Sequence, residues 1–192
     1  MIENVEMIEE YEMNPQTMIL LPFQCGTKLY TRIIEFYDEY VSPHPPIDIV
    51  RKSCEYFGSS YEGRREGTKR LTGIVYKAPI IIDSHTSIFS FPTTSPSHSN
   101  CIWVCEKYVH LHERVNAKMT NVIFKNGQSF HIPISASSFG TQRARTLTLT
   151  GRFMYAIDEM KKKEKHLLER QTNELEKKTN YWVDGRKRKN RV

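Results

Sequence analysis

The chain has 192 residues, of which 39% are hydrophobic and 11% aromatic, and Lys and Arg outnumber Asp and Glu by 28 to 22. This composition excludes wholesale disorder and suits one domain, or one domain with a tail. No apolar run approaches the roughly 18 residues that a membrane-spanning helix needs, and the acidic first residues are unlike a signal peptide. We therefore expect a cytoplasmic protein with no membrane partner.

Charge is distributed unevenly along the chain. The first 50 residues contain two Lys or Arg and nine Asp or Glu, whereas the remaining 142 contain 26 and 13. A surface this positive attracts polyanions, among which nucleic acid is the commonest. An anionic membrane would require a basic amphipathic helix with a wide apolar face or a lipidation site, and the sequence offers neither in convincing form.

The first part of the chain predicts strands followed by one short helix. The segment 5–13 suits a short strand or a loose arm, whereas the apolar run 17–21 and the stretch 29–37, rich in Tyr, Thr, Ile and Phe, favour strands. After a proline-rich connection, apolar residues recur at helical spacing over 46–57, and Gly58 is a suitable C-cap. We therefore predict a helix over 46–57.

The middle of the chain predicts further strands after one irregular segment. Residues 58–72 contain three glycines and are predicted as a loop or a broken helix. The segments 74–82 and 88–91 are predicted as strands, and the polar residues 93–100 as a loop. Residues 101–115 alternate between apolar and polar side chains, which predicts one long strand.

A β-hairpin is the most secure local prediction. Two strand-like segments, 119–124 and 129–134, flank the dipeptide Asn126-Gly127. That dipeptide suits a type I′ turn, because both central residues of such a turn need positive φ.

The sequence changes in character after Ser135. Phe153, Ile157 and Met160 recur at spacings of four and three, which predicts an amphipathic helix. The charged sequence beyond Met160 is too poor in leucine to sustain coiled-coil heptads and predicts a solvated helix that frays. The basic residues 185–191 are predicted to be a disordered tail.

These elements together predict an α+β fold. It consists of a mainly antiparallel sheet, a short helix before the segment 58–72, and a long C-terminal helix. We expect one domain over residues 1–160 and a charged helical extension with the basic tail over 161–192.

The spacing of the potential metal ligands gives only a weak indication of a metal site in this chain. Cys101 and Cys105 lie four residues apart with His110 and His112 nearby, but structural zinc sites usually combine two close cysteines with a second pair of ligands a loop away. Apolar and aromatic residues interleave with these side chains, so packed free thiols and surface histidines are the favoured interpretation. We predict no metal and no cofactor.

Catalytic motifs are equally weak. A phosphate-binding P-loop needs Lys and then Ser or Thr directly after its second glycine, whereas Gly63 is followed by Arg64 and Arg65. His110 and His112 share one face of the predicted strand, but no nucleophile elbow, paired carboxylates or HExxH motif accompanies them. We therefore predict that the protein is not an enzyme.

Candidate binding residues are densest between Ser53 and Asp83. This segment combines the glycines Gly58, Gly63 and Gly67 with five cations: Arg64, Arg65, Lys69, Arg70 and Lys77. Guanidinium groups bind phosphate in a bidentate way and fit a narrow, strongly negative minor groove, and glycine lets backbone N–H groups approach a phosphate. The alternative is that the glycines only cap a helix and turn a corner.

A second basic group comprises Arg143, Arg145 and Arg152, of which the last two lie seven residues apart and therefore on one face of a helix. Neighbouring threonines, Thr141 and Thr148, could also meet phosphate. An ordinary solvated helix face is the alternative interpretation of this group.

One long motif begins at Ser53 and reads SC-x-x-FGSSY-x-GR-x-x-GT. Downstream, Lys77, one residue and a proline lead into a strand end of the form I-I-x-D. Shorter pieces are Ile88-Phe89-Ser90-Phe91-Pro92-Thr93, Asn126-Gly127, Ile132-Pro133-Ile134-Ser135 and Ser138-Phe139. Together they resemble the family of the bacterial competence transcription factor ComK, over about Thr31 to Phe153.

The resemblance implies a transcriptional activator of DNA-uptake genes that works at the nucleoid. Such proteins bind A-rich and T-rich promoter boxes largely through the minor groove, without a helix-turn-helix, as homodimers that pair into tetramers on DNA. It also implies RNA polymerase as a partner, and a MecA-like adaptor with the Clp protease. The adaptor recognises a hydrophobic-aromatic C-terminal segment, for which Tyr181-Trp182-Val183 is the only candidate here.

The predicted DNA-binding residues are Arg64, Arg65, Lys69, Arg70, Arg143, Arg145 and Arg152. The open alternative is a basic RNA-binding or protein-interaction module with no role at promoters. An RNA-binding module would prefer single strands and stack bases on aromatic side chains.

Overall fold

The computed structural model of the protein describes residues 5–189, with side chains described through residue 176. The chain forms two compact units, residues 1–151 and 152–192. The elements in chain order are β1 (Glu6–Met7), β2 (Thr17–Cys25), β3 (Lys28–Glu35), β4 (Glu39–Ser42), α1 (Pro46–Tyr56), α2 (Tyr61–Thr72), β5 (Ile80–Asp83), β6 (Ile88–Pro92), β7 (Trp103–Cys105), the 3-10 helix η1 (Glu106–Tyr108), β8 (Val109–Asn116), β9 (Met119–Phe124), β10 (Ser129–Ile132) and α3 (Ala136–Lys189).

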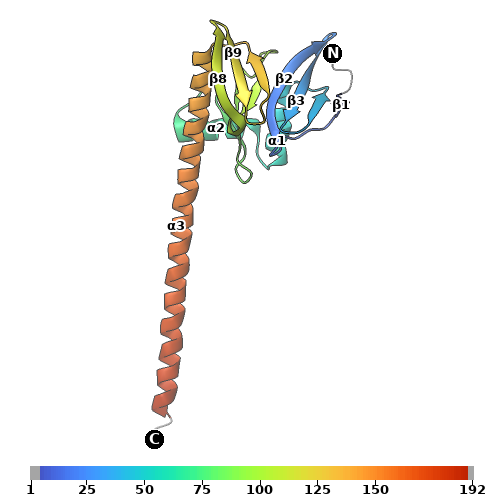
Figure 1. The fold of residues 1–192 in the computed structure, drawn as a ribbon. Coiled ribbons are helices and arrows are strands. Elements are labelled where there is room, and N and C mark those ends of the chain that lie inside the picture. The colour runs from blue at the N-terminus through green and yellow to red at the C-terminus, as the bar shows by residue number, and fades with distance from the viewer. Residues whose placement is uncertain (1–4, 190–192) are drawn as a thin grey trace. The chain divides into compact units, whose positions relative to one another are not determined.

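The strands of the first unit form two sheets. The larger sheet has seven strands in the order β1-β4-β3-β2-β7-β6-β5, and the smaller has three in the order β10-β9-β8. Among the described strands, only β1 and β4 pair in parallel. Figure 1 shows β2 and β3 of the larger sheet in blue and β8 and β9 of the smaller sheet in yellow shades. The predicted α+β class with a mainly antiparallel sheet and a long C-terminal helix is confirmed.

The larger sheet is buried on both faces. On one face Leu20, Ile33 and Trp103 pack with residues of α1 and α2. On the other face, the neighbouring residues Ile19, Ile34 and Val104 pack with β9, β10 and Phe139 of α3. Burial on both faces explains why β2 has a continuous apolar run rather than strict alternation. It also fixes α1 and α2 on one side of the sheet.

Two predicted strands were wrong in extent. The segment 74–82 is a strand only from Ile80, because residues 73–79 form the connection from α2. The long strand predicted over 101–115 is divided by η1. Its first piece, β7, pairs with β2 and β6 in the larger sheet, whereas its second piece, β8, pairs with β9 in the smaller one. The interruption is therefore the point at which the chain changes sheet.

The hairpin of β9 and β10 is confirmed, but its predicted type I′ turn is wrong. Gly127 has φ +86°, whereas Asn126 is not among the residues with positive φ. The Gly127 N–H donates to the Phe124 carbonyl at 2.9 Å, and the Phe124 N–H donates to the Gln128 carbonyl at 2.8 Å. This is the longer hairpin loop in which one glycine supplies the left-handed residue and forms a bulge.

Residues 61–72 form an intact helix, α2, and not the loop or broken helix predicted from the glycines. The Ser60 side chain caps its first turn by accepting the Gly63 N–H at 2.9 Å. Gly73, with φ +76°, ends the helix, and its N–H donates to the Lys69 carbonyl at 2.7 Å. An N-cap is worth about 1 kcal/mol, so the two caps offset much of the penalty of glycines inside the helix.

The two kinds of glycine in and after α2 predict opposite effects on stability. A Cβ at Gly67 would meet nothing within 4 Å in a right-handed helix, so Gly67→Ala should raise the free energy of unfolding by about 0.5–1 kcal/mol. Gly73→Ala should lower it by about 1–2 kcal/mol, because alanine resists the left-handed conformation. Thermal and urea denaturation of both variants check this, and a fall in stability for Gly67→Ala would contradict it.

The α3 helix starts where Ser135 accepts the Ser138 N–H at 3.2 Å, which is an N-cap geometry. Within the first unit, its buried side chains Phe139, Gln142, Thr146 and Leu149 face the protein. The Phe139 ring meets the Phe91 ring edge-on, with the centroids 5.4 Å apart. These contacts hold the first turns of α3 against the larger sheet.

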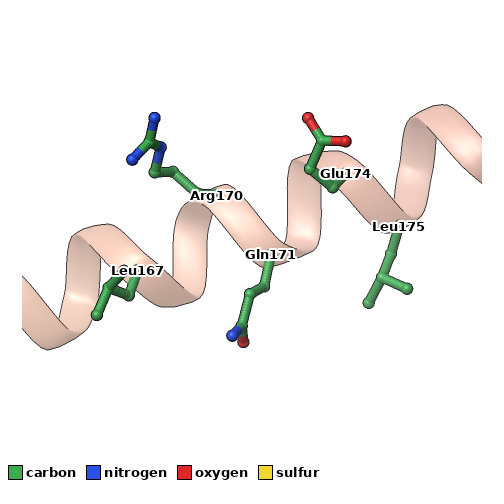
Figure 2. A pocket seen from close by; sticks show the side chains of 5 residues that line it. All are labelled: Leu167, Arg170, Gln171, Glu174 and Leu175. Carbon is green, nitrogen blue, oxygen red and sulfur yellow. The ribbon is translucent and has the colours of Figure 1, made fainter.

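The second unit consists of the rest of α3. Side chains of residues 161–176 are exposed, and the helix includes residues 185–189 of the segment predicted as a disordered tail. A shallow hollow is lined by Leu167, Arg170, Gln171, Glu174 and Leu175, and Figure 2 shows that all five come from successive turns of this one helix. No described helix is long and apolar enough to cross a membrane.

Candidate nucleic-acid interface

Helix α2 divides its side chains between the core and solvent. Tyr61 and Thr68, seven residues apart, are buried against the sheet. Arg65, Lys69 and Arg70 are exposed, and we call the exposed part of α2 that carries them its outer face. Three of the seven predicted DNA-binding residues therefore lie there, with Arg65 and Lys69 on adjacent turns of one stripe of the helix.

A cleft lies beside this face, between α1, α2 and the loops 73–79 and 93–102. We call it the α2 cleft. Its polar lining consists of Arg51, Tyr61, Glu62, Arg65, Lys77, Ser95 and Ser97. Three cations, one carboxylate and three residues with hydroxyl groups thus line a single space, and this combination suits a phosphate group.

Two guanidinium groups share one aromatic ring in the α2 cleft. The Cζ atom of Arg51 lies 5.9 Å from the Tyr61 ring centroid, and that of Arg65 lies 5.8 Å from it. Both distances fall within cation–π range. Burial raises the pKa of Tyr61 to about 12, against the opposing effects of Arg65 and Arg51, so the ring stays neutral at physiological pH.

The charges of the α2 cleft are not all neutralised within the protein. Arg51 pairs with Asp48 at 3.1 Å, in an exposed contact of the kind that contributes little. Arg65 has no ion-pair partner among the residues whose side chains are described. The two guanidinium groups over the Tyr61 ring repel each other, and a bound anion would reduce that repulsion. The cleft is therefore electrostatically suited to a phosphate.

A second, shallower groove continues along α2. It is lined by Glu62, Arg65, Glu66, Lys69 and Val75. Lys69 lies 3.4 Å from the Glu66 carboxylate, in an exposed pair that solvent and a competing phosphate can readily separate. Arg65 lines both hollows and so connects the two parts of the basic surface.

Arg64 lies on the inner side of α2, three residues after the buried Tyr61. Its Nη2 donates to the Phe57 carbonyl at 3.4 Å, and its Nε is buried without a hydrogen-bond partner in the described part of the chain. Burial raises the pKa of the Cys54 thiol to about 11, and Arg64 opposes that rise. Arg64 thus contacts the segment between α1 and α2 and is not among the residues that line the α2 cleft.

The predicted arginines of α3 do not form one surface. Arg143 pairs with Glu106 at 2.9 Å and donates to the Val109 carbonyl at 2.9 Å. Arg145 donates to the Gln142 side-chain oxygen at 3.1 Å. Arg152 is exposed and belongs to the second unit. Of this group, only Arg145 lies beside the segment that follows α2, through a 3.4 Å contact with the Tyr76 carbonyl.

The sequence interpretation did not assign Arg51, Lys77, Ser95 or Ser97 to the binding site. Arg51 lies in the segment predicted as a helix, 46–57, and Ser95 and Ser97 lie in the predicted polar loop 93–100. Their convergence depends on packing between segments far apart in the chain. The one local signal was Lys77, which stands in the same cation-rich segment as Arg65.

The thiols and histidines form no metal-binding group in the described residues. Cys54, Cys101 and Cys105 are buried, and Cys25 is exposed. Burial raises the pKa of Cys105 to about 12, which keeps that thiol protonated and unreactive at physiological pH.

Comparisons with known proteins agree on one family. The sequence profile of the ComK protein family matches residues 8–158. The competence transcription factor of Bacillus subtilis (strain 168) is 38% identical over 151 residues, which is 79% of this chain and 79% of that protein. No solved structure matches. The chain therefore belongs to the ComK family, a family of transcription factors and not of enzymes.

Proposed function

We propose that this chain activates transcription of competence genes by binding A-rich and T-rich promoter boxes, with the outer face of α2 and the α2 cleft on the minor-groove side of the duplex. The observation that carries the proposal is the convergence of Arg51, Arg65 and Lys77 on one cleft floored by the Tyr61 ring. The similar Bacillus subtilis protein, named as a competence transcription factor, supports the promoter role.

The chemistry of this surface favours a narrow groove. A·T-rich tracts have a narrow minor groove with enhanced negative potential, which attracts inserted arginine. Arg65 reaches solvent from the exposed part of α2. Lys69 and Arg70 are exposed on the same helix and would supply further contacts to the backbone of the duplex.

The proposed assembly and partners are those that the resemblance to the family implies. We propose that homodimers pair into tetramers on the promoter and assist RNA polymerase there, at the nucleoid in the cytoplasm. DNA binding is assigned to residues 1–160, and residues 161–192 to a charged extension; the family match, which ends at 158, supports that division. The candidate segment for a MecA-like adaptor and Clp, Tyr181-Trp182-Val183, lies outside the residues whose side chains are described.

The test is a gel shift at two salt concentrations with A·T boxes and with boxes of equal length in which G·C pairs replace A·T pairs. We expect the A·T boxes to bind at least tenfold more tightly, which corresponds to about 1.4 kcal/mol. Affinity for both should fall with salt, because bound phosphates release counterions. Equal affinity for the two duplexes would contradict readout by groove width.

A competition experiment distinguishes the proposed binding to A·T duplex from the RNA-binding alternative. Unlabelled single-stranded RNA is added to the complex with labelled A·T duplex, and unlabelled A·T duplex serves as the matched competitor. We expect the duplex to displace the label at a concentration at least tenfold lower than the RNA. More effective displacement by RNA would favour a single-strand binder that stacks bases on aromatic side chains.

A further inference from the structure

The connection from α2 to β5, residues 73–79, is fixed at both of its ends. Gly73 closes α2 through its hydrogen bond to Lys69. At the other end, the buried Thr68 hydroxyl of α2 donates to the Pro79 carbonyl at 2.8 Å. The segment is therefore held to the helix before it at the beginning and at the end.

The middle of the same connection is held by α3. Gln142, which is buried, donates through Nε2 to the Lys77 carbonyl at 2.9 Å and to the Pro92 carbonyl at 2.7 Å. Arg145 contacts the Tyr76 carbonyl. Lys77 has φ +48°, an uncommon conformation for a residue other than glycine. Backbone strain of this kind persists only where the surroundings impose it, and it concentrates at functional sites.

These anchors hold the backbone and leave two apolar side chains in solvent. Tyr76 is 84% exposed and Val75 is 44% exposed. Cations surround them: Val75 lines the groove with Arg65 and Lys69, and Lys77 follows directly in the chain. The protein thus holds a short apolar tip, Val75-Tyr76, rigidly within a basic surface.

We propose that Val75-Tyr76 is a wedge that enters the minor groove and opens one base step of the bound box. This inference rests on the proposed function. Proteins that bind the minor groove often insert apolar side chains between base pairs and kink the duplex. Steps such as TA in an A·T-rich box unstack readily. The Tyr76 ring supplies a flat face for stacking on the opened base pair.

Charge complementarity selects DNA over a second copy of the chain as the occupant of this tip. The charged side chains nearest to it are the four cations Arg65, Lys69, Lys77 and Arg145 and the two carboxylates Glu62 and Glu66, so positive charge is in excess there. The same basic surface on a second copy would meet this one with like charges, which is unfavourable. A phosphate backbone on each side of an opened step is attracted to those cations instead.

The experiment uses the full chain and A·T boxes in which 2-aminopurine replaces one adenine at a time, because this base becomes more fluorescent when it unstacks. We expect the wild type to raise the fluorescence at one step of each half-box. Tyr76→Ser combined with Val75→Ser should abolish that rise and weaken binding roughly tenfold. Tyr37→Ser, which replaces another tyrosine that is 82% exposed, is the matched control and should behave as the wild type.

The possible outcomes separate this inference from the proposed function. Tight binding by the wild type with no rise at any step would overturn the wedge and leave the proposed function intact. An undiminished rise in 2-aminopurine fluorescence with the double variant would also overturn the wedge and leave the proposed function intact. So would a double variant whose only defect, measured by light scattering, is loss of self-association. Failure of the wild type to bind A·T duplex would overturn both. Circular dichroism of each variant excludes unfolding as the cause.

Discussion

Replacing Arg51, Arg65 and Lys77 together with alanine is expected to weaken binding to an A·T box about a hundredfold at physiological ionic strength, with no loss of fold. Each phosphate contact contributes a salt slope of about −0.9 through counterion release, so three contacts account for about two orders of magnitude near 0.15 M salt. The three side chains line one cleft, and Arg65 has no ion-pair partner among the described residues. Isotherms at several salt concentrations give both the affinity and the slope.

A matched variant controls for net charge. Lys28, Lys118 and Lys125 are exposed lysines in or beside the turns of the two sheets, and their replacement by alanine removes the same formal charge. We expect this control to reduce affinity less than tenfold and to leave the salt slope nearly unchanged, because only contacts with DNA release counterions. Equal losses in the two triple variants would mean that overall charge, and not the α2 cleft, determines binding.

The second large effect is on stability. Arg143→Ala is expected to lower the free energy of unfolding by about 3 kcal/mol, because it leaves the Glu106 carboxylate with no partner. The two side chains are only 24% and 14% exposed. The guanidinium also satisfies the Val109 carbonyl, at the start of β8. Urea denaturation measures the change, and DNA affinity measured on the folded fraction should stay within about threefold of the wild type.

A neutral pair tests this role of Arg143. Glu106→Gln combined with Arg143→Met removes both charges and keeps similar volumes, so it should restore most of the lost stability. If Arg143→Ala instead left stability unchanged and removed DNA binding, the arginine would act on the nucleic acid and not as a link between α3 and η1. The two outcomes differ in both the denaturation midpoint and the DNA affinity.

Local signals in the sequence were sufficient for some elements. Helix α1 follows from apolar spacing and the proline before it, and the β9–β10 hairpin follows from Asn126-Gly127 between two strand-like segments. Helix α2 was predicted as a loop or a broken helix because the prediction rested on its glycines and not on the capping residues at its two ends. Ser60 and Gly73 stand at the two ends of that helix, and their hydrogen bonds offset much of the low helix propensity of Gly63 and Gly67.

The site itself was predictable only in part. Arg65, Lys69 and Arg70 emerged from cation density, whereas the inner position of Arg64 depends on the packing of α2 beside Phe57. No local pattern could place Arg51 of α1 on the same ring as Arg65, because that contact depends on how the two helices pack on the sheet. Likewise, Arg143 and Arg145 are two residues apart, yet only Arg143 meets a carboxylate, one supplied by η1.

The central claim is that the outer face of α2 lies on the minor groove of an A·T box. The most direct measurement attaches an iron chelate to a single exposed cysteine at Gly67→Cys, where a Cβ meets nothing within 4 Å, in a Cys25→Ser background that leaves only the three buried native thiols. We predict strand cleavage within the A·T boxes, displaced toward the 3′ side on each strand as expected of a minor-groove source. The same chelate at Lys118→Cys should cleave weakly. Cleavage displaced toward the 5′ side, or equal cleavage from both positions, would contradict the claim.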